Sequence, residues 1–306
     1  MFSYIIRQLF SSVFVLVGAT FFVFSLLFMV PGDPARVVAG DQATPELLGQ
    51  IQKELGLDQP FLMQYLAFLR RVAQGNLGFS YISQKSVLEE VTVRYGATLE
   101  LASAATLVAV LVGVSAGVIS AAFPNSTLDK VFMLIALSGI SIPVFWLGLI
   151  LILFFSLQLG WLPAVGRGGI EHLVLPALAL GARSSGVIAR ITRGSMLEVL
   201  NLDFVRTARA KGCSPSRVVL RHALNNALIP VITIVGLEIG YLLAGTVVTE
   251  TVFAWPGIGL YMVNSIRARD FPGVQGTALV IAASFLTINL LVDLLYAYAD
   301  PRIRTR

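Results

Sequence analysis

Long apolar runs constrain this chain more than any other feature of its sequence. They cover residues 9–30, 97–122, 131–157, 173–191, 228–248 and 276–298 of the 306 residues. A helix needs about 20 mainly apolar residues to cross the hydrocarbon core of a membrane, where its backbone must form hydrogen bonds within the helix itself. Hydrophobic residues make up 56% of the chain and charged residues 13%, whereas a soluble domain is about a quarter charged. We predict an all-α polytopic membrane protein with six transmembrane helices.

The first apolar run has two interpretations. Arg7 precedes it, as in a signal peptide, but the apolar core of a signal peptide is usually only about 7 to 15 residues long. The longer run therefore favours a retained first helix. The next segment, 31–95, is mixed and polar, with helix-like pieces at 45–55 and 60–73 and a turn-rich sequence at 75–80. We expect a small extramembrane insertion between the first two spans.

The loop between the fourth and fifth apolar runs indicates the orientation. Its acidic residues are Glu198 and Asp203. Its basic residues are Arg190, Arg193, Arg206, Arg209, Lys211, Arg217 and Arg221. Because loops rich in Lys and Arg stay cytoplasmic, both termini are predicted to be cytoplasmic and the insertion extracytoplasmic. The insertion also contains basic residues, but acidic ones accompany them and long segments are exported largely regardless of charge.

Catalytic and metal-binding patterns are missing from the sequence. The one Lys followed by Ser or Thr is Lys85, and Gln84 precedes it, so the phosphate-binding loop of an ATPase is absent. Cys213 is the single cysteine, and His172 and His222 are far apart, which disfavours a disulfide and a metal centre. We expect no catalytic residue, metal or cofactor in this chain. The net charge of +5 follows membrane sidedness and does not indicate nucleic acid.

The basic loop contains the signals of a helical elbow. Gly212 can adopt the left-handed conformation that ends a helix, and Ser214 with Pro215 is a typical start for the next one. Apolar residues then recur at helical spacing at Leu220, at Ala223 or Leu224, and at Ala227 or Leu228. Arg217 and Arg221 are one turn apart. The elbow fits a groove in a partner protein, or it is an ordinary cytoplasmic loop with a helix start.

This segment resembles the "EAA" coupling motif of importer-type ABC permeases, which docks into an ATPase subunit. Arg206, Thr207 and Ala208 stand where Glu-Ala-Ala is usual, Gly212 matches the motif's glycine, and residues 222–225 replace its Ile-x-Leu-Pro. The amino-acid sequence of residues 206–212 is similar to that of the peptide and nickel branch of these permeases. Further similar motifs are PGDP at 31–34, LGLDQP at 55–60, GNLG at 75–78, GWLP at 160–163 and ETVFAWPGIG at 250–259.

The resemblance implies a type I importer permease, similar to the B-type half of the dipeptide, oligopeptide and glutathione systems, in the inner membrane of a bacterium. Implied partners are a second homologous permease, two ATPase subunits that bind ATP and Mg, and an extracytoplasmic solute-binding protein. The chain would then comprise 1–30 with the first span, the insertion 31–95, and a five-helix core 96–306 that contains the coupling segment 193–230. The implied ATPase-coupling residues are Arg206, Thr207, Ala208, Arg209, Lys211, Gly212, Ser214, Arg217, Arg221 and His222.

Two glycine pairs predict close helix approach. Gly113 and Gly117 are expected to pack within the chain, whereas Gly236 and Gly240 are assigned to the translocation path or a subunit interface. Glu238 lies between the second pair, and an ionisable residue at that depth must face water or a partner. It either meets the positive end of a substrate or is a hydrogen-bonded structural residue.

Other polar and aromatic residues are also candidates for the path. Arg183 lies deep in the fourth span and either pairs with a neighbour or lines the route. Phe253, Trp255 and Pro256 are assigned to a loop over the outer mouth, with anchoring at the membrane interface as the alternative.

The predicted function is a permease subunit that forms half of the path of an ATP-driven peptide importer. A nickel or metal-chelate importer and a self-contained secondary transporter are the alternatives, although the inverted halves of the latter are not visible in the sequence. A membrane enzyme is opposed by the missing catalytic patterns.

Overall fold

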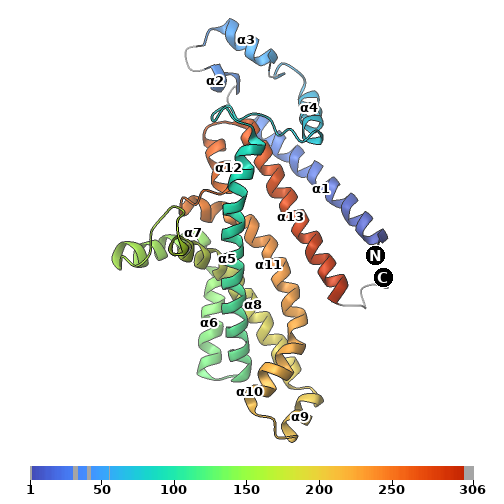
Figure 1. Cartoon of the computed structure of the whole chain (residues 1–306), viewed down its shortest axis with the longest axis vertical. Helices are drawn as coiled ribbons and strands as arrows, with labels where there is room; N and C mark the ends of the chain where they lie inside the picture. The colour runs from blue at the N-terminus through green and yellow to red at the C-terminus, as the bar shows by residue number, and fades with distance from the viewer. Residues whose placement is uncertain (1, 30–33, 40–42, 55, 300–306) are drawn as a thin grey trace. The chain divides into compact units, whose positions relative to one another are not determined.

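The computed structural model describes residues 2–29, 34–39, 43–54 and 56–299, most of which are helical (Figure 1). Its contacts define two compact units, one of residues 1–97 and 256–286 and the other of 98–255 and 287–306. An isolated antiparallel bridge pairs Phe79 with Ser86, and no strand occurs in the described ranges. The predicted all-α class is confirmed. The expected domain boundaries at residues 30 and 95 divide the chain into consecutive segments, whereas the two units are defined by contacts. These boundaries stay a prediction.

Four helical segments in the described residues are long and apolar enough to cross a membrane. They are α5 (Val87–Ala122), α8 (Ile170–Leu200), the run Pro215–Val252, and Phe271–Val292 within α13 (Phe271–Ala299). The helix α1 (Phe2–Met29) adds a shorter apolar stretch, Phe10–Leu26. The predicted number of six crossings is compatible with this arrangement.

The third apolar run is not one straight helix. It forms α6 (Thr127–Ser141), α7 (Val144–Leu151) and the π-helix η1 (Ile152–Gln158), with a bend of 110° between α6 and the later part. Ile142 is extended, with ψ 128°, because the ring of the following proline disfavours helical geometry at the residue before it. The run expected at 131–157 therefore forms a bent pair of helices, and Pro143 lies at the break.

The first unit contains the helices of the insertion. These are α2 (Pro34–Ala39), α3 (Pro45–Glu54) and α4 (Phe61–Ala73). Helices α3 and α4 agree with the pieces expected at 45–55 and 60–73, whereas α2 was not expected. Buried Tyr65 of α4 packs edge-on against Phe24 of α1 and donates its hydroxyl to the Val17 carbonyl at 2.8 Å. The insertion is thus fastened to the first helix. Residues 31–33 of the PGDP motif lie outside the described residues.

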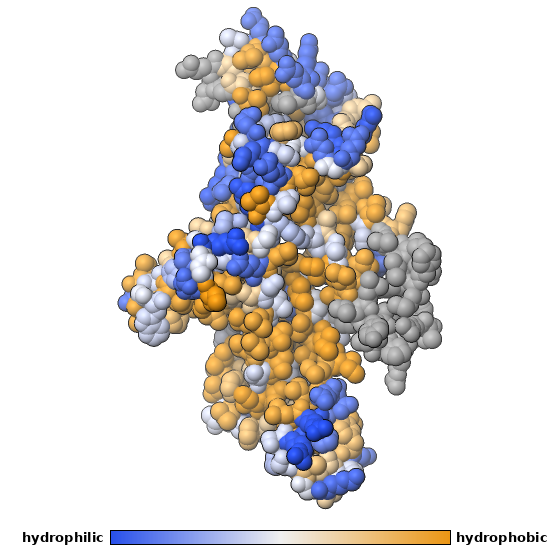
Figure 2. All heavy atoms as spheres, viewed as in Figure 1, coloured by the Kyte–Doolittle hydropathy of each residue, from blue (hydrophilic) through white to orange (hydrophobic). Residues whose placement is uncertain are grey.

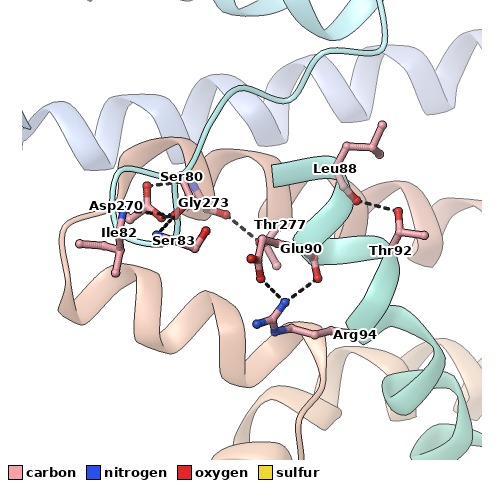
Figure 3. A network of polar contacts seen from close by, with 10 residues as sticks. All are labelled: Ser80, Ile82, Ser83, Leu88, Glu90, Thr92, Arg94, Asp270, Gly273 and Thr277. Carbon is pink, nitrogen blue, oxygen red and sulfur yellow. Dashed lines mark hydrogen bonds and ion pairs between the residues drawn. The ribbon is translucent and has the colours of Figure 1, made fainter. Parts of the chain in front are cut away.

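A buried carboxylate fixes the turn before α5 in the same unit (Figure 3). Asp270, at the start of α13, accepts a hydrogen bond from the Ser80 hydroxyl at 2.5 Å and one from the Tyr81 backbone N–H at 3.0 Å. Close by, Glu90 and Arg94 form an ion pair one turn apart on α5. These contacts tie the turn to α13 and continue into the first turns of α5.

The second unit is built around α8. Ile188 of α8 packs with Ala109 of α5 and Val231 of α11 (Leu224–Val252) in a buried cluster. A Cβ atom added to Gly113 would lie 2.7 Å from the Ser185 carbonyl oxygen, and one on Gly117 would meet α8 even more closely. The expected packing of this glycine pair within the chain is confirmed.

Candidate functional site

The predicted elbow is present in the second unit. Helix α9 (Asp203–Ala210) ends before Gly212, whose φ of +78° is left-handed, and α10 (Pro215–Arg217) begins with proline at its first position. The π-helix η2 (Val218–Ala223) then leads into α11. Ser214 holds the extended N-cap position, with ψ 147°, but its hydroxyl caps no backbone N–H.

An apolar side of the elbow packs against α5 and α8. Ala223 and Ala227 are fully buried against Val118 of α5 and Met196 of α8. Of the predicted apolar stripe, Ala223 and Ala227 therefore face the interior. Leu220, by contrast, is 57% exposed.

The opposite side of the elbow is open and basic. Figure 2 shows hydrophilic residues gathered over α9 and α10, whereas hydrophobic residues cover much of the long helices. The exposed predicted residues are Arg206, Thr207, Arg209, Lys211, Gly212, Ser214, Arg217 and Arg221, while Ala208 and His222 are partly buried. Apolar Leu202 and Phe204 are exposed among these charges, and Asp203 contacts Arg206 at 3.2 Å. This face combines positive charge with protruding apolar side chains, which suits an acidic protein groove.

A buried ion pair braces α8 immediately before this segment. Arg193 donates from Nε and Nη2 to the two carboxylate oxygens of Asp129, both at 2.8 Å. Asp129 lies in the first turn of α6 and also accepts from the Ser120 hydroxyl and the Asn125 backbone N–H. The α5–α6 hairpin and α8 are therefore fixed together at this end. Arg193 was expected only as one of the loop charges, and its pairing with Asp129 was not predicted because the two residues are 64 positions apart.

The two charged residues predicted in the membrane lie side by side. Glu238 is buried and accepts from the Ser184 hydroxyl at 2.5 Å, and Arg183 Nη1 lies 3.4 Å from the same carboxylate oxygen. Gly236 and Gly240 are also buried within the chain. Glu238 thus has the hydrogen bonds of the structural alternative, and Arg183 has a neighbour to pair with, which was one of its two expected arrangements.

The predicted outer-loop residues differ in exposure. The side chains of Phe253 and Trp255 are buried, whereas Pro256 is exposed. The Phe253 carbonyl accepts from the Gly166 backbone N–H at 2.8 Å, and the guanidinium of Arg167 lies 5.9 Å from the Trp255 ring centroid. Both aromatic side chains are thus buried instead of reaching outward. Phe253 packs against Leu175 and Ala179 of α8. No sequence signal pointed to the contacts with the loop at 166–167.

Ligands for a metal ion do not gather in the described part of the chain, where no group of three or more His, Cys, Asp or Glu residues could hold one.

Comparison with known proteins assigns the family. Residues 113–305 match the model described as "Binding-protein-dependent transport system inner membrane component". Residues 1–102 match the corresponding N-terminal model of such membrane components. Together these matches cover nearly the whole chain, including the insertion and the elbow.

Relatives of full length are similar to this chain. The "Dipeptide transport system permease protein DppB" of Alkalihalophilus pseudofirmus is 43% identical, over 99% of this chain and 100% of the relative. The "Glutathione transport system permease protein GsiC" of Escherichia coli K12 is 44% identical, over 99% of both chains.

Solved structures share the fold. An inward-facing MetNI methionine ABC transporter has a chain that matches with a TM-score of 0.59 and 19% identity, over 69% of this chain and 96% of that one. An amino acid ABC transporter solved with histidines gives a TM-score of 0.54 and 18% identity, over 69% and 94%. The matches to both family models and the full-length relatives show that this chain belongs to the family of binding-protein-dependent transport system inner membrane components.

Proposed function

We propose that this chain is a permease subunit of an ATP-driven importer for peptides of the dipeptide or glutathione class, and that it forms half of the path. The observation that carries the proposal is the full-length similarity to dipeptide and glutathione permeases. The family consists of membrane components of transport systems, so the task of the chain is translocation and not catalysis.

The exposed elbow supplies the connection to an ATPase. Its partners in the proposed complex are two ATPase subunits that bind ATP and Mg, a second permease and an extracytoplasmic binding protein. Arg206, Arg209, Arg217 and Arg221 are exposed and suit an acidic groove of the ATPase, with Phe204 and Leu220 as apolar contacts. Because Ala223 and Ala227 are buried against α5 and α8, a displacement of the elbow by the ATPase moves these two helices.

Orientation follows from the same proposal. The basic elbow lies on the cytoplasmic side of a bacterial inner membrane, with both termini on that side and the insertion outside. Gly236, Gly240 and Glu238 then shape the wall of the path from within, while Phe253, Trp255 and Pro256 belong to its outer end.

An ATPase assay on the assembled complex tests the proposal. The chain is purified with its companion permease and the two ATPase subunits, and hydrolysis is measured with the binding protein loaded with a dipeptide, glutathione or a nickel chelate. Stimulation by a peptide-loaded binding protein is the expected result. Stimulation by the nickel chelate alone would assign a metal importer, and a chain that does not co-purify with an ATPase would contradict the proposal.

A further inference from the structure

A partly exposed arginine lies near the middle of one span and contacts a glutamate near the middle of another. Arg183 follows 13 residues after the start of α8, which is 31 residues long, and it contacts Glu238 near the middle of α11. Both helices belong to the second unit. The cluster is therefore distant from the ends of both helices and from the elbow.

The carboxylate of this cluster is already engaged. The Glu238 side chain is only 10% exposed, and one of its oxygens lies within reach of both the Ser184 hydroxyl and Arg183. This carboxylate oxygen of Glu238 therefore already has two hydrogen-bond donors.

The guanidinium is positioned differently. The Arg183 side chain is 32% exposed, and its Cζ lies 3.8 Å from the centroid of the Tyr241 ring. Tyr241 is itself exposed on α11. Stacking uses the flat face of a guanidinium and leaves its edge, which carries five N–H donors, available. The contact with Glu238 involves Nη1 alone and at 3.4 Å.

Lipid cannot cover this exposed edge. A charged side chain at the centre of a bilayer is strongly unfavourable unless it faces water, a partner or the interior of the bundle. Leu237, which precedes Glu238 on α11, is exposed and has no hydrogen-bonding side chain. The N–H donors of Arg183 that Glu238 does not engage are therefore open to an anion from outside this chain.

We propose that Arg183 binds the main-chain carboxylate of the transported peptide, with Glu238 and Tyr241 as positioning residues. This inference rests on the proposed peptide-importer function. A planar guanidinium pairs with a carboxylate through two parallel hydrogen bonds, and every peptide with a free C-terminus offers that group. The site would thus recognise a feature common to peptides of different sequence, while the binding protein selects among side chains.

A binding experiment without the binding protein tests this site. Alanyl-alanine and its C-terminal amide are titrated onto the purified permease and ATPase complex, and binding is followed by ligand-observed NMR. The variants are Arg183→Gln and Arg183→Lys, with Arg190→Gln as the matched control because Arg190 is exposed on the same helix two turns later. Uptake by the wild-type importer is measured separately.

The wild-type complex is expected to bind the free dipeptide about tenfold more tightly than the amide. Arg183→Gln removes that preference, Arg183→Lys reduces it because an ammonium group cannot form two parallel hydrogen bonds to a carboxylate, and Arg190→Gln retains it. Equal binding of both ligands by the wild type, as when a partner subunit's acid occupies Arg183, overturns the inference. So does a preference that survives in Arg183→Gln. If Arg183→Gln does not assemble, an unchanged preference in Arg183→Lys is decisive against it.

Measurements of uptake distinguish a failure of the Arg183 site from a failure of the proposed peptide-importer function. A wild-type importer that carries peptides while its Arg183 variants retain the carboxylate preference refutes this site and leaves the proposed function standing. A wild-type importer that carries no peptide refutes the function, and the inference falls with it.

Discussion

Arg193 and Asp129 form a bidentate ion pair, with both N–O distances at 2.8 Å, at the end of α8 that leads into the elbow. Asp129 is 5% exposed and Arg193 is 28% exposed. The pair holds the α5–α6 hairpin against α8, and it therefore fixes the base on which the elbow is mounted.

Breaking this pair should destabilise the protein. Arg193→Gln leaves a buried carboxylate without its cation, and loss of one partner of a buried pair costs about 3 kcal/mol. We expect a clearly lower melting temperature of the purified complex in detergent. The control is Arg190→Gln, which changes an exposed arginine on the same helix. The double change Asp129→Asn with Arg193→Gln should lose less than Arg193→Gln alone, and equal losses would refute the assigned pairing.

Close packing of α5 on α8 leads to a second prediction. A methyl group added at Gly117 would lie 2.5 Å from Thr192 Cβ and 2.7 Å from the Ala189 carbonyl oxygen. Gly117→Ala is therefore expected to lower stability by about 1 to 3 kcal/mol, as overpacking does. Gly194→Ala on α8 is the control because its added methyl meets nothing within 4 Å. Thermal unfolding in detergent distinguishes the two, and similar melting temperatures would contradict the described helix contact.

The elbow depends on the backbone conformation of one residue. Gly212 has a φ of +78°, and a Cβ atom added to it would meet nothing within 4 Å, so a side chain there is disfavoured by conformation and not by crowding. Gly212→Ala should cost about 1 kcal/mol and weaken retention of the ATPase. Gly212→Asn should be milder, since Asn tolerates the left-handed region better. Retention is measured as the ATPase recovered with the tagged permease, and the reverse order of the two variants would contradict the prediction.

Charge on the elbow should control ATPase docking. Replacing Arg206, Arg209 and Arg217 by Gln removes three exposed cations, and we expect at least a tenfold loss of ATPase affinity from the lost charge complementarity. The same triple variant should respond less to added salt than the wild type, because fewer charges remain to be screened. Arg70→Gln with Arg71→Gln, exposed on α4, is the matched control. An unchanged affinity in the elbow variant would place the docking surface elsewhere.

Sequence patterns predicted the local features best. The left-handed Gly212, the start at Pro215 and the helices at 45–55 and 60–73 depend on neighbouring residues, which the sequence displays directly. The break at Pro143 was also visible in principle, but the apolar character of 131–157 outweighed it in the prediction.

Long-range pairings were beyond the sequence. Asp129 meets Arg193 across 64 positions, and Ser184 meets Glu238 across 54. Which acid pairs with which base depends on helix packing, and apolar periodicity does not specify that packing. The same limit applies to Phe253 and Trp255, whose aromatic character fits both a membrane interface and the buried positions that they occupy.

Uphill uptake tests the central claim most directly. Proteoliposomes that contain this chain, its companion permease and the ATPase subunits are supplied with binding protein and radiolabelled dipeptide, and accumulation is compared with and without ATP. We predict accumulation above the outside concentration with ATP, and none when the ATPase subunits are omitted. Uphill accumulation by this chain alone, driven by an ion gradient, would contradict the account.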